Sequence, residues 1–201
     1  MAKHELLNTE ALYSGNGYVE TATGVFEFRS PVFNVGDIGH ALRQLCRFNG
    51  HTSEFYSVAQ HSEHVARIME YFGEGDPLEG LLHDGTEAYL SDVPAPFKQF
   101  FPDLQKYDAE MDRLLRLQYG LPPEKTEACK RADWLALFME AELFMPSRGA
   151  NYPDPHNLRA SATRLLHHEL LGPAMYSEWE RLLLRYDPQG RCRAADAARR
   201  A

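Results

Sequence analysis

Apolar and polar residues alternate near the start of the chain and recur at helical spacing after it. The segment GYVETATGVFEF contains two alternating stretches around an Ala-Thr-Gly turn, which predicts a β-hairpin over residues 17–30. From Asn34 onward, apolar residues recur every three or four positions, and this period predicts amphipathic helices. The pattern therefore indicates a helical protein with a small β-hairpin in front of it.

Turn signals divide the helical region. Asn34 is an expected N-cap, and Pro77 suits the first turn of a helix. The expected helices span residues 34–48, 57–72, 77–90, 106–119, 123–145, 157–171 and 174–186. We predict an all-α bundle in one domain, residues 1–186, whose helical core spans about residues 34–186. We expect the polar residues 187–201 to form a frayed tail.

Composition narrows the class of protein. The chain has 201 residues and a net charge of −8, from 21 basic and 29 acidic side chains. This balance argues against a binder of nucleic-acid polymers, which needs a basic face. No apolar run approaches the roughly 20 residues that cross a membrane, and no signal peptide is recognisable at the N-terminus. Three widely spaced cysteines suggest reduced thiols and a cytoplasmic location.

The segment LLHDGTEAYLSDVP, residues 81–94, places ionisable groups at the end of an apolar stretch. His83 and Asp84 are adjacent, so on a helix their side chains leave about 100° apart and both reach an ion only over the face between them. His61 lies on the inward stripe of the second expected helix. Asp133 lies mid-helix among apolar neighbours, where an unpaired acid is costly to bury.

Each of these residues also has a simpler explanation. His61 alone could be a hydrogen-bonded core histidine, and Asp133 alone could pair with Lys130 or Arg131. Two histidines and two aspartates on inward positions of three helices together indicate a shared divalent metal ion. Mixed imidazole and carboxylate ligands suit Co, Mn, Fe or Zn, and Mg stays possible. Four protein ligands on an octahedral ion would leave positions for water and substrate.

The order of His61, His83-Asp84 and Asp133 resembles the H…HD…D signature of the HD-domain phosphohydrolases. The segment HDGTEAYLSDVPAPFK is similar to the YfbR-like 5′-deoxynucleotidases, a group that includes the dATP triphosphohydrolase of phages. The likeness covers about residues 30–145. It implies an HD-domain fold, a nucleotide substrate, self-association into a homo-oligomer, and the host cytoplasm as location if a phage encodes the chain.

The resemblance also assigns roles to individual residues. Asp84 and Glu87 are the expected catalytic residues, Asp84 as a metal ligand and Glu87 as a proton carrier four residues after His83 on the same helix face. Glu87 could instead be an exposed helical glutamate. The expected substrate-binding residues are Arg47, Phe48, His51, Asp92 and Lys98. Of these, Arg47 and Lys98 would contact phosphate, Phe48 the nucleoside, and Asp92 a sugar hydroxyl, while His51 would contact phosphate or support His61. Asp92 could also be an ordinary turn residue, and Lys98 a surface lysine.

Several functions fit this pattern. A deoxynucleoside 5′-monophosphatase would release phosphate. A deoxynucleoside triphosphohydrolase would release triphosphate and would need further cations, for which Arg43, Lys98 and Lys130 are available. A degenerate HD domain that only binds nucleotides or assembles with partners belongs to another class, and retention of all four ligands counts against it. A phosphodiesterase of signalling nucleotides fits the metal site but fits Arg47-Phe48 less well.

Overall fold

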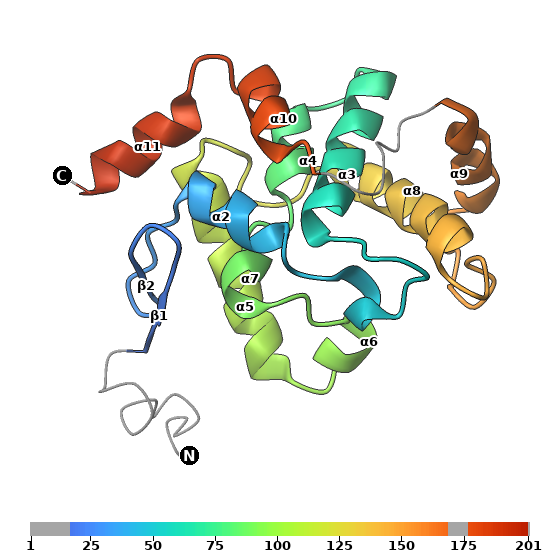
Figure 1. The fold of residues 1–201 in the computed structure, drawn as a ribbon, viewed down its shortest axis with the longest axis horizontal. Helices are drawn as coiled ribbons and strands as arrows, with labels where there is room; N and C mark the ends of the chain where they lie inside the picture. Colours follow the sequence, from blue (N-terminus) through green and yellow to red (C-terminus); the bar gives the residue numbers. More distant parts are fainter. Residues whose placement is uncertain (1–16, 169–176, 201) are drawn as a thin grey trace.

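The computed structural model describes residues 17–168 and 177–200 of the chain (Figure 1). The described residues are mostly helical, with one two-stranded antiparallel sheet near the N-terminus, as the hydrophobic pattern predicts. The elements, in chain order, are β1 Tyr18–Glu20, β2 Val25–Glu27, α2 Val35–Leu42, the 3-10 turn η2 Arg47–Gly50, α3 Val58–Phe72, α4 Pro77–Leu82, α5 Glu87–Leu90, α6 Ala95–Lys98, α7 Pro102–Gln118, α8 Glu127–Phe144, α9 Arg159–Leu165, the 3-10 turn η3 Leu166–His168, α10 Trp179–Tyr186 and α11 Arg191–Arg200.

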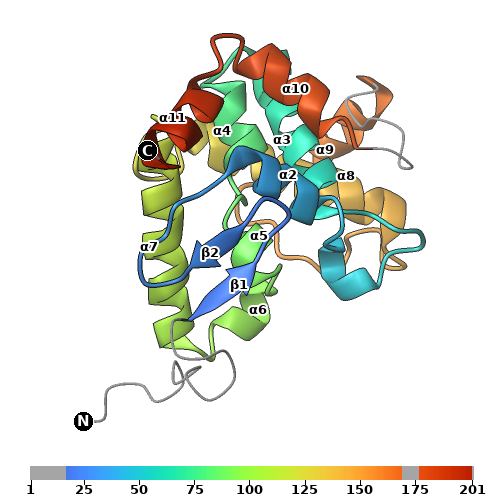
Figure 2. The same ribbon diagram turned by 60° about the vertical axis from the view of Figure 1, so that its left-hand side comes forward.

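The hairpin of β1 and β2 lies beside α5 and α7 (Figure 2). Phe26 is the buried residue of β2, and its ring stacks on Tyr89 of α5 with centroids 3.8 Å apart. The turn between the strands is held by Asp37 of α2, whose carboxylate accepts hydrogen bonds from the hydroxyls of Thr21 and Thr23. The hairpin therefore covers one side of the helical core.

Local capping signals explain where the main helices begin. Asn34 caps α2 as expected, by accepting from the backbone N–H of Asp37. Ser57 and Gln60 form a reciprocal capping box at the start of α3. Asp76 caps α4, with Pro77 in its first turn, and Thr126 caps α8.

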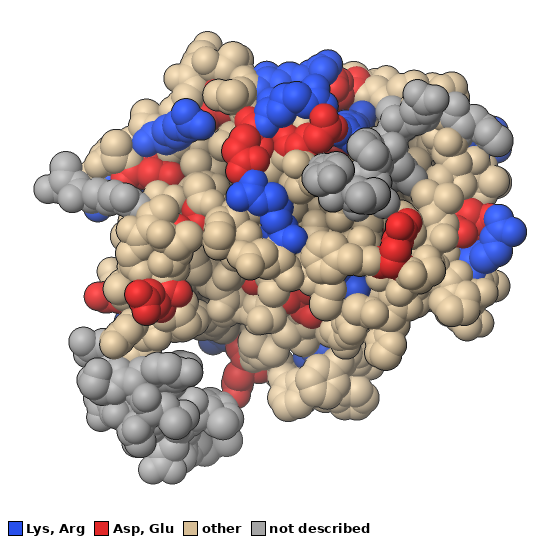
Figure 3. All heavy atoms as spheres, viewed as in Figure 1, with Lys and Arg blue, Asp and Glu red and all other residues tan. Residues whose placement is uncertain are grey.

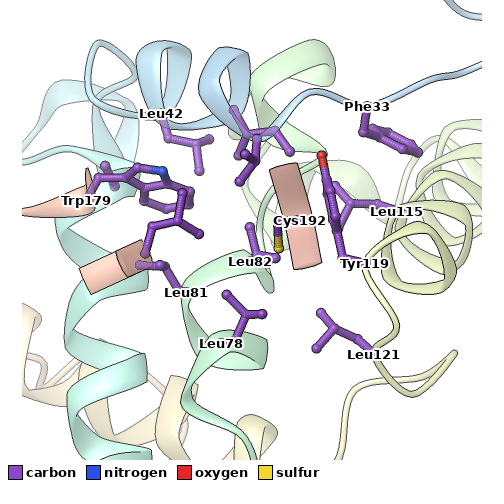
Figure 4. Packing of buried hydrophobic residues seen from close by; sticks show 14 of the residues in the cluster. Phe33, Leu42, Leu78, Leu81, Leu82, Leu115, Tyr119, Leu121, Trp179 and Cys192 are labelled. Atoms are coloured by element: carbon purple, nitrogen blue, oxygen red, sulfur yellow. The ribbon is translucent and has the colours of Figure 1, made fainter. Parts of the chain in front are cut away.

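Helix α3 is the centre of the fold. It packs against α4 and α8, and all but four of its residues are buried. One apolar cluster joins α3 to α2, α4, α7 and α10, with Leu81, Leu82, Leu115 and Trp179 among its buried members (Figure 4). A second cluster lies between α3, α8 and α9. Because α3 is buried on nearly all sides, a polar side chain on this helix must form its hydrogen bonds with other groups of the protein.

Several predicted helices have different bounds. The helix expected over residues 77–90 is interrupted, because α4 ends at Leu82 and residues 83–86 form a turn before α5. The helix expected over residues 34–48 ends at Leu42. The helices expected over 106–119 and 123–145 are confirmed in place as α7 and α8. Residues 169–176, on which the prediction placed parts of the last two helices, lie outside the described residues.

The expectation of a frayed tail is wrong for residues 191–200. They form α11, and Cys192 on this helix is fully buried in the larger apolar cluster. Asp196 accepts hydrogen bonds from the side chains of Gln118 and Tyr119 and from the backbone N–H of Val35. The polar composition of this segment does not predict these contacts. One small apolar face and one buried acid are nevertheless enough to fix a short helix.

Charged side chains of both signs are interleaved on the face of the molecule drawn in Figure 3. Among the described residues near α10, Arg67 pairs with Glu178 and Arg185 pairs with Glu70. Across residues 17–168 and 177–200, every helix is too short or too polar to span a membrane.

Candidate metal centre

Three helices bring the predicted ligands together. His61 lies in the first half of the central helix α3, His83 and Asp84 follow the last residue of α4, and Asp133 lies in α8. Because α3 packs against both α4 and α8, residues 22 to 72 positions apart in the sequence become neighbours. The two histidines are fully buried, whereas the Asp133 side chain is about one third exposed. The site is therefore internal on one side and open to solvent on the other.

The ligand atoms converge on one point. The Nε2 atoms of His61 and His83 are 3.2 Å apart, and His61 Nε2 lies 3.1 Å from Asp133 Oδ1. Asp84 Oδ2 lies 3.1 Å from His83 Nε2 and 3.5 Å from His61 Nε2. One atom each from His61, His83 and Asp133 lies within 4.8 Å of the others, a spacing that could hold a metal ion.

The donor set and its spacing fit a divalent cation. Ligand atoms about 2.1 Å from an ion are about 3.0 Å apart in an octahedral arrangement and about 3.4 Å apart in a tetrahedral one. The distances from His61 Nε2 to His83 Nε2 and to Asp133 Oδ1 fall in this range. The 3.5 Å from His61 Nε2 to Asp84 Oδ2 and the 3.8 Å from His83 Nε2 to Asp133 Oδ1 lie slightly above it. Two imidazole nitrogens that face each other beside two carboxylates favour a shared positive charge, which either a proton or a metal ion could supply.

The geometry around His83 differs from the prediction. His83 and Asp84 were expected side by side on a continuous helix, with Glu87 one turn further on. Instead the backbone N–H of Gly85 donates to Leu82 and that of Glu87 donates to Asp84, which makes a turn between two short helices. His83 Nδ1 lies 2.8 Å from the carbonyl oxygen of Gly80, which fixes the ring with Nε2 toward the cluster.

Glu140 is the main residue that the sequence analysis missed. Its carboxylate is fully buried, and Oε1 lies 2.7 Å from His61 Nδ1. Glu140 also accepts a hydrogen bond from the hydroxyl of Tyr56. A carboxylate behind a metal-ligating histidine fixes its tautomer and orientation. The available signal was its position, since Glu140 follows Asp133 by two helical turns and sits in an apolar stretch.

The electrostatics of the centre favour a positive charge at His61. Burial and the neighbouring Arg47 lower the pKa of His61, but the carboxylates of Glu140 and Asp133 outweigh both and raise it to about 10. Burial alone would raise the pKa of Asp84, but His83 and Lys125 beside it hold it well below its ordinary value. The cluster therefore keeps a negative ligand ionised and stabilises a cation, either a proton or a metal ion.

A cavity of about 310 Å³ opens beside Asp84. The residues that line it include His83, Glu87, Lys98, Asp108, Asp112 and Lys125. One carboxylate oxygen of Glu87 is buried without a hydrogen-bond partner among the described residues. Burial and the nearby Asp84 and Asp92 raise the pKa of Glu87 well above its ordinary value. The expected proton carrier thus lines the same cavity as His83 and Asp84, from the first residue of α5.

Arg47, Phe48 and Asp92 lie together on another side of His61. Arg47 Nη2 is 3.5 Å from His61 Nδ1, and its Nη1 is 3.7 Å from Asp92 Oδ2. The guanidinium lies over the Phe48 ring at 5.3 Å from the centroid. Phe48 has a positive φ of 53°, in a turn that places the ring beside Arg47. The structure therefore brings three of the five expected substrate residues close to the centre.

The other two expected substrate residues, Lys98 and His51, differ in their position relative to the site. Lys98 lines the cavity and forms an ion pair with Asp108, so it is more than a solvated surface lysine. His51 is exposed at the end of η2, and within residues 17–168 and 177–200 no hydrogen bond or ion pair joins it to the cluster. The geometry brings Lys98 to the site and leaves His51 apart from it.

The simpler explanation of Asp133 does not hold. Lys130 pairs with Glu127, and Arg131 pairs with Glu74, so neither neighbouring cation satisfies this acid. The contacts of Asp133 go instead to His61 and His83. The simpler explanation of His61 as a hydrogen-bonded core histidine also does not account for its contacts, because its second ring nitrogen, Nε2, faces the cluster.

Comparisons with known proteins identify two relatives. The uncharacterized protein YfdR of Escherichia coli (strain K12) is 41% identical over 106 residues, which are 53% of this chain and 58% of YfdR. The chain thus matches less than two thirds of the length of that relative. The uncharacterized protein RCAP_rcc00048 of Rhodobacter capsulatus is 34% identical over 149 residues, which are 65% of this chain and 76% of that protein. No family model matches the chain.

Proposed function

We propose that this chain, which belongs to the same family as the Rhodobacter capsulatus protein RCAP_rcc00048, is a metal-dependent HD-domain phosphohydrolase of deoxynucleotides. The observation that carries the proposal is the meeting of His61, His83, Asp84 and Asp133 beside a cavity. These four side chains come from α3, α8 and the turn after α4. Separate structural roles would not explain why they meet at one site.

The four converging residues, His61, His83, Asp84 and Asp133, would hold a divalent ion. When bound, such an ion lowers the pKa of a water molecule and polarises a phosphoryl oxygen. Asp84 and Asp133 would balance the charge of the ion, and the buried imidazoles of His61 and His83 would supply neutral nitrogen ligands. Glu140 would keep His61 turned so that Nε2, rather than Nδ1, faces the ion.

The remaining residues of the site have roles that follow from their positions. Glu87 lines the cavity with a carboxylate oxygen that no described residue hydrogen-bonds and with a pKa raised well above its ordinary value, so it is suited to accept and return a proton. Lys98 would offset charge on phosphate oxygens from the cavity, and Arg47 would do so from the side of His61. Asp92 beside Arg47 would accept a hydrogen bond from a sugar hydroxyl, and Phe48 would pack against the nucleoside.

The charges around the cavity favour a monophosphate over a triphosphate. Of the three further cations considered for a triphosphate, only Lys98 lines the cavity, whereas Arg43 pairs with Glu180 and Lys130 with Glu127. Four acids, at positions 84, 87, 108 and 112, line the same cavity, against two lysines, Lys98 and Lys125. A triphosphate carries more negative charge than this wall would tolerate, so we propose a 5′-monophosphatase as the first candidate and the triphosphohydrolase as the second.

A product analysis tests the proposal. The protein, loaded separately with Mn²⁺, Co²⁺, Zn²⁺ or Mg²⁺, is incubated with deoxynucleoside monophosphates and triphosphates, and the products are identified by chromatography. We expect deoxynucleoside and inorganic phosphate from the monophosphates. Release of triphosphate would instead favour the second candidate. Nucleotide binding without turnover for any metal would refute the enzyme and favour the degenerate binding module.

Two further arms complete the test. Cyclic and linear signalling dinucleotides in the same panel separate the phosphodiesterase alternative. Sedimentation of the metal-loaded protein tests self-association, which stays a prediction from the family resemblance.

A further inference from the structure

The two oxygens of Asp84 face two different positive groups. Oδ2 lies 3.1 Å from His83 Nε2 and belongs to the proposed metal centre. Oδ1 accepts a hydrogen bond from the ammonium group of Lys125, at 3.1 Å. A carboxylate can bind one cation through each of its oxygens. Asp84 therefore has the arrangement of a bridging carboxylate, with the ammonium group on the side where a second cation would bind.

The surroundings of Lys125 are those of a cation position. Its side chain lines the cavity together with Asp84 and Asp112. One oxygen of Asp112 is buried without a hydrogen-bond partner among the described residues. The ammonium group therefore lies in a cavity whose acids, Asp84 and Asp112 among them, would attract a cation.

A buried network fixes the place of Lys125 in the chain. The next residue, Thr126, donates from both its backbone N–H and its hydroxyl to Glu79 of α4. Glu79 also pairs with Arg116 of α7, and both side chains are almost completely buried. Arg116 in turn donates to the carbonyl oxygen of Glu124. Lys125 is therefore held between two anchored neighbours, so its position does not depend on its own ion pair.

We propose that the ammonium group of Lys125 is the built-in second cation of the centre, so that the protein binds one divalent ion per chain. Two-metal sites place their ions about 3.5–4 Å apart to stabilise both sides of a displacement at phosphorus. A lysine in the second position supplies one positive charge to the cavity and excludes another ion. The inference rests on the metal centre of the proposed function.

Metal stoichiometry tests this inference without an activity assay. The metal-free wild type and three variants are titrated with Mn²⁺ up to about 1 mM, with bound ion measured by equilibrium dialysis and by electron paramagnetic resonance. Lys125→Glu adds a carboxylate beside Asp84, and Lys125→Ala only frees the space. Lys130→Glu is the matched control, because it adds the same charge to an exposed position five residues further along. Thermal melting checks that each variant is folded.

The expected results differ between the variants. The wild type and Lys130→Glu should bind one ion per chain and show an uncoupled Mn²⁺ signal. Lys125→Glu should bind two, with an exchange-coupled signal, and its second ion should bind at least tenfold more tightly than any second ion of the wild type. Lys125→Ala should take a weaker second ion.

Three outcomes would overturn the inference. Two coupled ions in the wild type would show that Lys125 does not exclude the second ion. One ion in the folded Lys125→Ala protein, and in Lys125→Glu if that variant also folds, would show that the position does not bind a cation. In both cases the proposed metal centre would stand. A wild type that binds no divalent ion would refute the proposed centre together with this inference.

Discussion

Replacement of Glu140 tests how much of the metal affinity depends on a residue that never touches the ion. Glu140 Oε1 lies 2.7 Å from His61 Nδ1, and both side chains have no exposed surface. At this distance and burial, the hydrogen bond is charge-assisted and holds the imidazole ring in one orientation. Burial alone would raise the pKa of Glu140, but His61 and Arg47 keep it far below its ordinary value. The carboxylate is therefore ionised at every pH of interest.

The size of the effect follows from this geometry. Loss of a hydrogen-bond partner behind a metal-ligating histidine costs about 10- to 100-fold in metal affinity, or about 1.4–2.7 kcal/mol. We expect Glu140→Ala to reach the upper end, because His61 then loses its orienting group completely. Glu140→Gln keeps an oxygen near Nδ1 and near the Tyr56 hydroxyl but loses the charge, so we expect it to lie near the lower end.

Isothermal titration of the metal-free proteins with Mn²⁺ measures these affinities. Glu142→Gln is the matched control, because Glu142 lies on the same helix two residues further on and, among the described residues, its ion pair is with exposed Arg148. It should bind Mn²⁺ with the affinity of the wild type. Folded Glu140→Ala and Glu140→Gln proteins that both bind Mn²⁺ within twofold of the wild type would refute the orienting role.

Three further predictions concern the ligands, the chemistry and the packing. Asp84→Ala should lose bound metal and turnover together, because the ion loses a negative ligand, and an active, metal-loaded variant would contradict the ligand assignment. Glu87→Ala should keep its metal, measured by elemental analysis, while the rate falls about 10²- to 10⁴-fold; a loss of metal would show that Glu87 is a ligand instead. Gly80→Ala should lower the free energy of unfolding by about 1–3 kcal/mol in urea denaturation, because a Cβ there would lie 2.8 Å from Ala66 Cα. Gly24→Ala, where a Cβ would meet nothing within 4 Å, is its control and should stay within about 0.5 kcal/mol.

The sequence by itself determined the class of fold and the identity of the converging residues. The hydrophobic period gave helices where α3, α7 and α8 are found, and the alternating stretch gave the hairpin, because these patterns depend only on which face of an element is buried. Asp133 and His61 were also recognisable from the sequence. Each lies in an apolar stretch, where an unpaired polar group is costly to bury.

The tertiary structure decided how these residues are held and what surrounds them. The turn after Leu82 arises where Gly85 packs against Leu115 of α7, a contact between segments thirty residues apart. Glu140 is part of the site because α8 packs against α3. Helix α11 is held by buried Cys192 and by the hydrogen bonds that Gln118 and Tyr119 donate to Asp196.

Lys125 illustrates the difference most clearly. The sequence analysis placed it near the start of the helix expected over residues 123–145, with nothing to mark it, whereas α8 begins only at Glu127. In the folded chain its ammonium group contacts Asp84 in the wall of the cavity, because the Glu79–Arg116 pair anchors the loop. Local patterns report which residues avoid water, whereas the partner of a charged side chain depends on distances between helices that no local pattern encodes.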